Sequence, residues 1–277
     1  MMRRVIFNQK GGVGKSSITV NLAAIAAARG KRTLVIDLDP QCNSSQYLLG
    51  EKATHGQNNP VLEPNIGNFF EEILSATPNK GLMGGLGNLL KQKEKGLDAF
   101  IHPSNFERLL VIPASPELGA MEHALQSKHK IFKLRDALRA LDGQFDEVFI
   151  DTPPAFNFFT LSALIAVERV VIPFDCDVFS SRALMTLLEN VAESQSDHNA
   201  SLEVEGIVVN QYQSRASLPQ QVVQELKDQG LPVFASMLPS SVIMKESHQK
   251  NQPLIHLVPD HKLTLAFNQL YDEMVTR

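Results

Sequence analysis

Residues 9–17 read Gln9-Lys10-Gly11-Gly12-Val13-Gly14-Lys15-Ser16-Ser17, and no other segment says as much about the architecture. An apolar run, Val5–Phe7, precedes this segment, and an alanine-rich segment of helical length, Ser17–Arg29, follows it. Glycines let backbone N–H groups converge on an anion, and the amino end of a helix adds a positive dipole. This order predicts a phosphate-binding loop, whose expected nucleotide contacts are Gly11, Gly12, Val13, Gly14, Lys15, Ser16 and Ser17.

Two side chains at the end of this loop have the chemistry of a nucleotide site. Lys15 would reach the β- and γ-phosphates, and the Ser16 hydroxyl would ligate Mg²⁺. The strict GxxxxGK[ST] pattern is not met, because Gln9 stands where its first glycine should be, and Lys10 adds a second cation. The alternative is a glycine-rich turn without a ligand. We disfavour it because the strand, the helix, the lysine and the serine are all in register.

Short apolar runs alternate with segments of helical length along the whole chain. The runs are continuous rather than alternating, which is typical of parallel strands covered on both faces. The expected strands are Val5–Phe7, Thr33–Ile36, Leu109–Ile112, Val148–Ile150, Val170–Ile172 and Gly206–Val209. The expected helices include Ser17–Arg29, Ile131–Leu141, Arg182–Ala192 and Gln220–Gln229. This rhythm predicts an α/β fold with a doubly wound, mainly parallel sheet and helices on both faces.

Carboxylates follow two of the expected strands. Asp37 and Asp39 come directly after one of them, and Asp151 ends another, before a loop stiffened by two prolines. Ligands of open α/β sheets bind beyond the carboxyl ends of the strands, so these acids are expected beside the phosphate-binding loop. We expect Ser16, Asp37 and Asp151 to form the metal site and Asp39 to orient a water. The alternative for Asp37 and Asp39 is an Asp–Pro turn with a local cap.

Length and composition exclude several classes of protein. The 277 residues are 43% hydrophobic and 20% charged, an ordinary globular balance, and the formal net charge of -4 gives no global basic field for nucleic acid. Cys42 and Cys176 lie far apart and form no CxxC, which argues against a metal or iron–sulfur site and suits the reducing cytoplasm. Lys10 and Lys15 interrupt the first apolar stretch, so we expect neither a signal peptide nor a membrane span.

We expect a single domain over residues 1–277, with an insertion at about 50–96. That region contains an expected helix around Phe69–Leu74, the glycine-rich run Gly81–Gly87 and the charged run Lys91–Lys95. No strand leads into the glycines, so a mobile loop is favoured over a second phosphate-binding site.

These motifs together resemble the ParA/MinD family of deviant Walker A ATPases, and in particular the short ParA proteins that lack an amino-terminal DNA-binding domain. The segments that carry the resemblance are Lys10–Ser17, Asp37–Gln41, Val111–Leu118, Asp151–Pro154, Val171–Cys176, Gly206–Asn210 and Leu238–Val242. They cover nearly the whole chain outside residues 50–96, and the Lys-Gly-Gly-x-Gly-Lys-[Ser/Thr] element is highly specific. The resemblance implies a P-loop NTPase fold of the deviant Walker A type.

The resemblance also implies roles for individual residues. Lys10 matches the signature lysine, which reaches phosphate across an ATP-sandwich dimer, and with Lys15 and Asp39 it completes the expected catalytic set. Asp39 matches the acid that positions or activates the hydrolytic water. Asn210 and Pro239 match positions that contact the adenine. The implied cofactors are ATP and Mg²⁺.

Two residues depart from the family pattern. Cys42 stands where these proteins usually carry glycine after Asp-Pro-Gln, which bears on the flexibility of that loop. Ser240 replaces a basic residue that is tied to DNA binding in relatives. A basic helix could replace it, because the segment from Lys128 to Asp142 has a local charge of +3, from five basic and two acidic residues. Its basic residues are Lys128, Lys130, Lys133, Arg135 and Arg139. A second option is the set Lys245, Lys250 and Lys262.

The expected function is that of a cytoplasmic ATPase that dimerises on ATP and positions or partitions a cargo, such as a plasmid, a chromosome region or a large protein assembly. A ParB-like or adaptor protein is expected to stimulate hydrolysis, and association with the nucleoid through non-specific DNA binding is left open. Membrane binding is disfavoured, because the terminal segment Leu263–Arg277 carries Asp272 and Glu273. Two alternatives are an ATP-dependent ligase of the dethiobiotin or cobyrinate amidase type on the same fold, and a nucleotide-gated binding module with negligible turnover.

Overall fold

Seven strands form one sheet in the computed structural model, which describes residues 1–53, 62–75, 95–176 and 180–277. The strand order is β3-β4-β2-β5-β1-β6-β7. All neighbouring strands are parallel except β3 and β4, which pair antiparallel at one edge. The strands are β1 (Met2–Ile6), β2 (Thr33–Asp37), β3 (His102–Pro103), β4 (Leu109–Ile112), β5 (Glu147–Asp151), β6 (Arg169–Asp175) and β7 (Glu203–Asn210).

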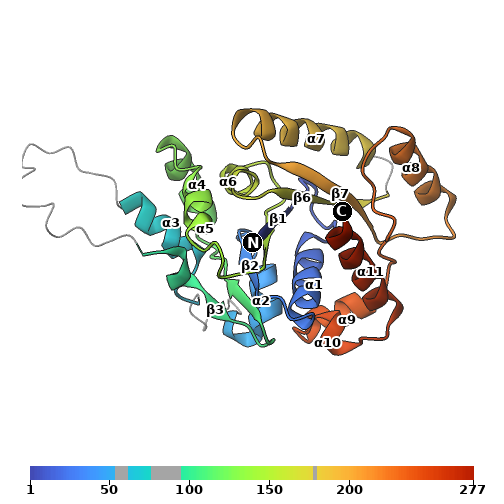
Figure 1. Cartoon of the computed structure of the whole chain (residues 1–277), viewed down its shortest axis with the longest axis horizontal. Coiled ribbons are helices and arrows are strands. Elements are labelled where there is room, and N and C mark those ends of the chain that lie inside the picture. The colour runs from blue at the N-terminus through green and yellow to red at the C-terminus, as the bar shows by residue number, and fades with distance from the viewer. Residues whose placement is uncertain (54–61, 76–94, 177–179) are drawn as a thin grey trace, which may run out of the picture.

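Helices cover both faces of this sheet (Figure 1). One buried cluster joins the sheet to α3 (Ile66–Ser75), α4 (Leu118–Ser127), α5 (Lys133–Arg139), α6 (Phe158–Ala166), α7 (Ser180–Asp197) and α8 (Ser217–Asp228). The other joins it to α1 (Lys15–Ala28), α2 (Asn43–Leu49), α10 (Leu254–Leu257) and α11 (Lys262–Thr276), with α9 (Ile243–Gln249) against the same layer. The short 3-10 helices are η1 (Gly50–Ala53) and η3 (Leu97–Phe100).

The continuous apolar runs form parallel strands that are covered on both faces, as predicted. The strands β1, β2, β4 and β5 are buried along almost their whole length, because helices on both faces exclude water from both sets of side chains. The α/β fold with a doubly wound, mainly parallel sheet is therefore confirmed. The antiparallel strand β3 was not predicted, and its two residues are too few to show a pattern.

The region around residues 50–96 is described only in part. The helix expected around Phe69–Leu74 is present as α3, whose Phe69, Phe70 and Ile73 belong to the buried core. The glycine-rich run Gly81–Gly87 and most of the run Lys91–Lys95 lie outside the described residues. The single domain with an insertion at about 50–96 stays a prediction.

The carboxyl-terminal segment is part of the core. Six apolar side chains of α11 are buried against the layer that contains α1: Leu263, Ala266, Phe267, Leu270, Tyr271 and Met274. In the part of the chain that the structure describes, no helix combines the length and the apolar character needed to cross a bilayer.

Candidate functional site

The loop between β1 and α1 has the geometry that the sequence predicts for a phosphate-binding loop. Gly12 and Gly14 adopt φ angles of 78° and 90°, a left-handed conformation that suits glycine. A Cβ atom at Gly14 would lie 2.4 Å from Nδ2 of Asn210, so this position also lacks room for a side chain. The backbone angle thus favours glycine at both positions, and close approach to Asn210 adds to this preference at Gly14.

The amino end of α1 is open to an anion. Gly14 caps the helix without a side-chain hydrogen bond, and the first turn carries no acidic residue. The N–H groups of a first helical turn have no partner inside the helix, and they carry the positive end of the helix dipole. This end of α1 is therefore ready to bind phosphate.

Lys15 lies at the start of α1 with its charge turned back onto the loop. Its Nζ donates to the carbonyl oxygen of Lys10 at 3.0 Å, and the side chain is buried. Burial lowers the pKa of Lys15, and the nearby carboxylates of Asp151 and Asp39 oppose that shift. A lysine ammonium has three donors, and among the described residues that of Lys15 is hydrogen-bonded to this neutral carbonyl alone, so it has hydrogen-bonding capacity left for phosphate oxygens.

A cavity of about 650 Å³ opens in front of this loop. Its lining joins the phosphate-binding loop to the segment after β2 and to the carboxyl end of α9. The described residues that line it are Gly11, Gly12, Gly14, Lys15, Ser16, Ser17, Asp39, Gln41, Asn43, Gln46, Tyr47, Pro154, His248, Gln249 and Asn251. Most of the predicted phosphate contacts thus face one space, and Asp39 faces it too.

Asp37 and Asp151 lie side by side at the carboxyl ends of β2 and β5, where they are partners in the strand register. Both are fully buried. Asp37 accepts hydrogen bonds from the backbone N–H and hydroxyl of Ser45 at 2.8 Å and 2.7 Å. Asp151 accepts from the hydroxyl of Ser44 at 2.7 Å, and the hydroxyl of Ser16 lies near enough to lower its pKa.

These two carboxyl groups are held where ionisation is unfavourable. Burial, together with the charge of Asp151, raises the pKa of Asp37 to about 8. Burial also raises the pKa of Asp151 to about 6, although the hydroxyls of Ser16 and Ser44 oppose the shift. A divalent cation at this point would relieve the repulsion between the two anions.

The donor set at this point fits Mg²⁺. The hydroxyl of Ser16 lies near the carboxylate of Asp151, and hydroxyl and carboxylate oxygens are ligands that this ion prefers. Within the described residues no group of three or more His, Cys, Asp or Glu side chains converges on one point. The protein would therefore supply only part of the coordination shell, and phosphate and water the rest, as Mg²⁺ sites at nucleotides usually do.

The segment between Asp39 and Ser45 is fixed by short hydrogen bonds. Oδ1 of Asp39 accepts from the backbone N–H of Gln41 at 3.0 Å, and the carbonyl of Asp39 accepts from the N–H of Cys42 at 2.8 Å. Burial raises the pKa of Asp39, whereas the hydrogen bond from Gln41 and the charge of Lys15 lower it. Cys42 adopts a φ of 57°, so this cysteine has the left-handed backbone that glycine adopts without strain.

Lys10 and the two predicted adenine contacts lie outside the described lining of the cavity. The Nζ of Lys10 contacts both carboxylate oxygens of Asp175, at 2.8 Å and 3.0 Å. Asn210 ends β7, and its Nδ2 donates to the carbonyl of Val13 at 2.9 Å. Pro239 forms an isolated bridge with Tyr212, close to Asn210 in the chain. These three residues therefore lie at the β6–β7 side of the loop, and the carboxylates at the β2–β5 side.

Several residues of the site were missed by the sequence reasoning. Ser44 and Ser45 hold the two buried carboxylates, and nothing in their local pattern indicated this. Asp175 could have been found, because it lies three residues after the expected strand Val170–Ile172 and ends the observed strand β6. His248 lies on α9, far from the loop in sequence, and its Nε2 lies 2.9 Å from the hydroxyl of Ser17.

The basic segment Lys128–Asp142 is not one helix, and this expectation was wrong. Lys128 caps the end of α4, a turn follows, and α5 begins only at Lys133. Nζ of Lys128 donates to the carbonyl of Leu74 at 3.2 Å, and Arg135 pairs with Asp136 at 2.8 Å. Ser240 is exposed in the segment before α9. The basic residues are thus divided between the end of α4, the turn and α5, and the charge of Arg135 is already paired.

Comparison with known proteins agrees with this geometry. A family model described as an AAA domain matches residues 2–204. The chain is 32% identical to the chromosome partitioning protein ParA of Myxococcus xanthus, over 90% of this chain and 79% of that protein. It is also 32% identical to the chromosome-partitioning ATPase Soj of Thermus thermophilus, over 100% of this chain and 96% of that protein.

The fold is shared with an enzyme of a different class. The cobyrinic acid a,c-diamide synthase from Mycobacterium smegmatis, solved with a bound ATP analogue and magnesium, superposes with a TM-score of 0.76 and 24% identity. The match covers 98% of this chain and 93% of that one. At this identity the likeness concerns the fold alone. The sequence matches, which are higher, show that the chain belongs to the ParA/MinD family of ATPases.

Proposed function

We propose that this member of the ParA/MinD family is a partitioning or positioning ATPase that binds MgATP, dimerises on ATP and hydrolyses it under stimulation by a partner protein. The observation that carries the proposal is the juxtaposition of the open amino end of α1, Lys15 and Asp39 in one cavity, with the pair Asp37 and Asp151 directly behind it. The relatives named for chromosome partitioning support the cargo-positioning part.

Each residue has a defined task in this proposal. The glycine N–H groups and Lys15 bind the phosphates, and Lys15 exchanges its contact with the carbonyl of Lys10 for phosphate oxygens. Ser16 and the buried acids Asp37 and Asp151 hold Mg²⁺, which supplies charge neutralisation at the β- and γ-phosphates. Asp39 orients the attacking water, because its carboxylate faces the cavity and its pKa is raised by burial.

The adenine contact and the dimer contact belong to the other side of the loop. Asn210 and Pro239 read the adenine, in line with their place beside Val13 and Tyr212. Lys10 reaches phosphate across the dimer interface, so the nucleotide becomes part of that interface and ATP drives dimerisation by its higher affinity for the dimer.

Variants of Lys15 and Asp39 test the two halves of this function. Wild type is expected to bind MgATP with micromolar affinity, about -8 kcal/mol, and Lys15→Ala to lose that binding by calorimetry. Asp39→Ala should retain ATP and accumulate as a dimer without turnover, because the phosphate contacts remain. The matched control is Lys31→Ala, which removes an exposed lysine after α1. Equal affinity of wild type and Lys15→Ala would contradict the phosphate site.

The two alternatives predict different kinetics. A ligase of the dethiobiotin or cobyrinate amidase type would turn over ATP only in the presence of a small carboxylate substrate. A nucleotide-gated binding module would dimerise on ATP but show no product in a single-turnover assay. Turnover by the chain alone, raised by a partner and lost in Asp39→Ala, is expected for the proposed function and for neither alternative.

A further inference from the structure

The ammonium group of Lys10 is already bound to an anion in this structure. Nζ lies 2.8 Å and 3.0 Å from the two carboxylate oxygens of Asp175, and 35% and 26% of the two side chains are exposed. A lysine ammonium has three donors and binds phosphate as a compact charge. Nζ is within hydrogen-bond distance of both oxygens of the Asp175 carboxylate, so this contact occupies the group that would bind a phosphate.

The backbone around Lys10 is fixed, whereas its side chain can move without disturbing the loop. The N–H of Lys10 donates to Oδ1 of Asn8 at 2.9 Å, and Nδ2 of Asn8 donates to the carbonyl of Pro173 at 2.6 Å. The carbonyl of Lys10 accepts from Lys15 at 3.0 Å. These loop contacts use backbone atoms of Lys10, so rotation of its side chain away from Asp175 leaves them in place.

Asp175 stands on a rigid support. It is the last residue of β6 and lies opposite Asn210 in the register with β7. Asn210 in turn donates to the carbonyl of Val13 in the phosphate-binding loop. The carboxylate is thus presented by the sheet edge itself, within the same group of contacts that holds the loop.

We propose that Asp175 is a positioning residue that holds Lys10 on its own subunit until the phosphates of a nucleotide-loaded dimer compete for it. This inference rests on the proposed ATP-driven dimerisation. A triphosphate carries close to four negative charges and attracts the ammonium more strongly than one carboxylate does. Each subunit must open one such ion pair, so the contact sets the ATP concentration at which the dimer forms.

The test is ATP-dependent dimerisation of Asp175→Asn, which keeps the shape of the side chain and removes its charge. Opening a partly exposed pair has a small cost, but a symmetric dimer opens two of them. We therefore expect the ATP concentration at half-maximal dimerisation, measured by sedimentation or light scattering, to fall roughly fivefold. With ADP the variant should remain a monomer. Asp175→Glu restores the charge and should return the midpoint towards that of wild type.

The matched control is Glu72→Gln on α3, which removes another lysine–carboxylate pair, with Lys95 at 3.1 Å, and should leave the midpoint unchanged. Asp175→Ser serves as a second neutral variant if the asparagine variant melts at a lower temperature than wild type. An unchanged or higher midpoint in the neutral variants, with wild type dimerising on ATP, would overturn the inference alone. A wild-type protein that stays monomeric with ATP would overturn the proposed function as well.

Discussion

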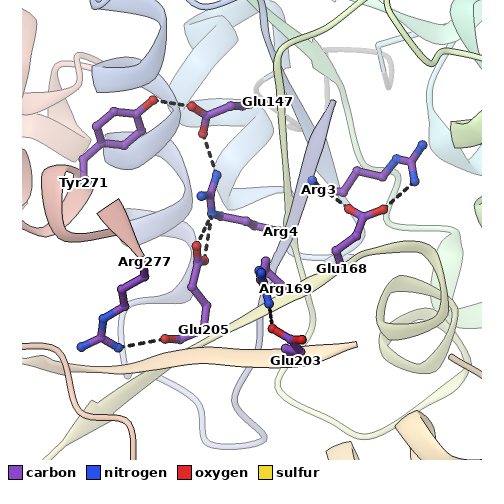
Figure 2. A network of polar contacts seen from close by, with 9 residues as sticks. All are labelled: Arg3, Arg4, Glu147, Glu168, Arg169, Glu203, Glu205, Tyr271 and Arg277. Atoms are coloured by element: carbon purple, nitrogen blue, oxygen red, sulfur yellow. Dashed lines mark hydrogen bonds and ion pairs between the residues drawn. The ribbon is translucent and has the colours of Figure 1, made fainter. Parts of the chain in front are cut away.

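The strand β5 begins and ends with a buried acid, and the two acids have opposite kinds of partner: a cation at the amino end and a second acid at the carboxyl end. At the amino end, Glu147 accepts from the guanidinium of Arg4 at 2.7 Å and from the hydroxyl of Tyr271 (Figure 2). The same Arg4 contacts both carboxylate oxygens of Glu205, at 2.8 Å and 3.0 Å. At the carboxyl end, Asp151 meets Asp37, a second acid, and the hydrogen bonds between protein groups come from serines and backbone N–H groups.

The difference separates a structural use of buried charge from a functional one. A buried acid beside a buried arginine is neutralised by the chain itself, and the pair adds nothing that a ligand could complete. At the carboxyl end no arginine of the described residues pairs with the two buried acids: burial raises the pKa of both, the charge of Asp151 adds to the shift at Asp37, and the charge of Asp39 adds to the shift at Asp151. The buried charges at the amino end of the sheet therefore stabilise the fold. Those at the carboxyl end destabilise the metal-free protein, and binding of MgATP would remove that cost.

The largest expected effect comes from removing the cation at the amino end. Arg4→Met leaves Glu147 and Glu205 buried without their shared partner, so the free energy of unfolding should fall by about 3–5 kcal/mol. Chemical denaturation with wild type and variant at the same pH measures this. Arg32→Met is the matched control, because its pair with Asp146, at 2.9 Å, is exposed. A similar loss in both variants would show that burial at the amino end does not matter.

The opposite sign is expected at the carboxyl end. Asp151→Asn can keep its contacts, since the amide oxygen accepts from the N–H of Thr152 and the amide N–H₂ donates to the hydroxyl of Ser44. It removes one of two repelling charges. We expect the metal-free variant to be more stable than wild type by roughly 2 kcal/mol at pH 8, while its Mg²⁺-dependent binding of ATP weakens.

The pH dependence follows from the direction of these shifts. The pKa values of Asp37 and Asp151, about 8 and about 6, lie above the ordinary value of 3.8. At a pH between 3.8 and the raised pKa of each acid, the folded protein holds a proton that the unfolded chain has released. The stability of the metal-free protein should therefore fall as the pH rises from about 4 to about 8. In Asp151→Asn this slope should be smaller. An equal slope, measured by denaturation at several pH values, would contradict the coupling.

The carboxyl end of the sheet was predictable from the sequence, and the amino end was not. The apolar runs that end in Asp37 and Asp151 predict parallel strands, and parallel strands place their carboxyl ends at one edge. The contact between Arg4 on β1 and Glu205 on β7 joins residues 201 positions apart, and only the strand order, with β6 alone between β1 and β7, brings these elements together. The left-handed angle of Cys42 and the contact of Lys10 with Asp175 likewise depend on packing.

Two buried tyrosines allow the hydrogen bonds at the amino and carboxyl ends of the sheet to be compared, with a smaller expected effect on stability. Tyr271 donates to the charged Glu147, whereas Tyr47, on the wall of the cavity, is hydrogen-bonded to the neutral Ser247. Hydrogen bonds to charged groups contribute more than neutral ones, so Tyr271→Phe should cost about 2 kcal/mol and Tyr47→Phe about 1 kcal/mol. Denaturation of both variants measures the difference. A larger loss in Tyr47→Phe would mean that the cavity wall, rather than the amino end, carries the more stabilising hydroxyl.

The smallest expected effect concerns backbone strain in the loop that follows Asp39. Cys42 is buried, and its φ of 57° is unfavourable for any residue with a Cβ atom. Cys42→Gly and Cys42→Ala both remove the thiol, which lies 3.4 Å from the carbonyl of Pro40, so their difference isolates the conformational term. Glycine is usually less stable than alanine in regular elements, but here it should be more stable by about 1 kcal/mol.

The same pair of variants links this strain to function. The N–H of Cys42 donates to the carbonyl of Asp39, and Cys42 caps α2, which carries Ser44 and Ser45. If the left-handed residue positions Asp39 and the two serines, Cys42→Gly should keep turnover close to wild type, because glycine retains the angle without cost. Cys42→Ala should retain it only at reduced stability. Equal stability of the two variants would show that no backbone strain is stored at Cys42. The difference between the carboxyl and amino ends of the sheet would then rest on the buried acids Asp37 and Asp151.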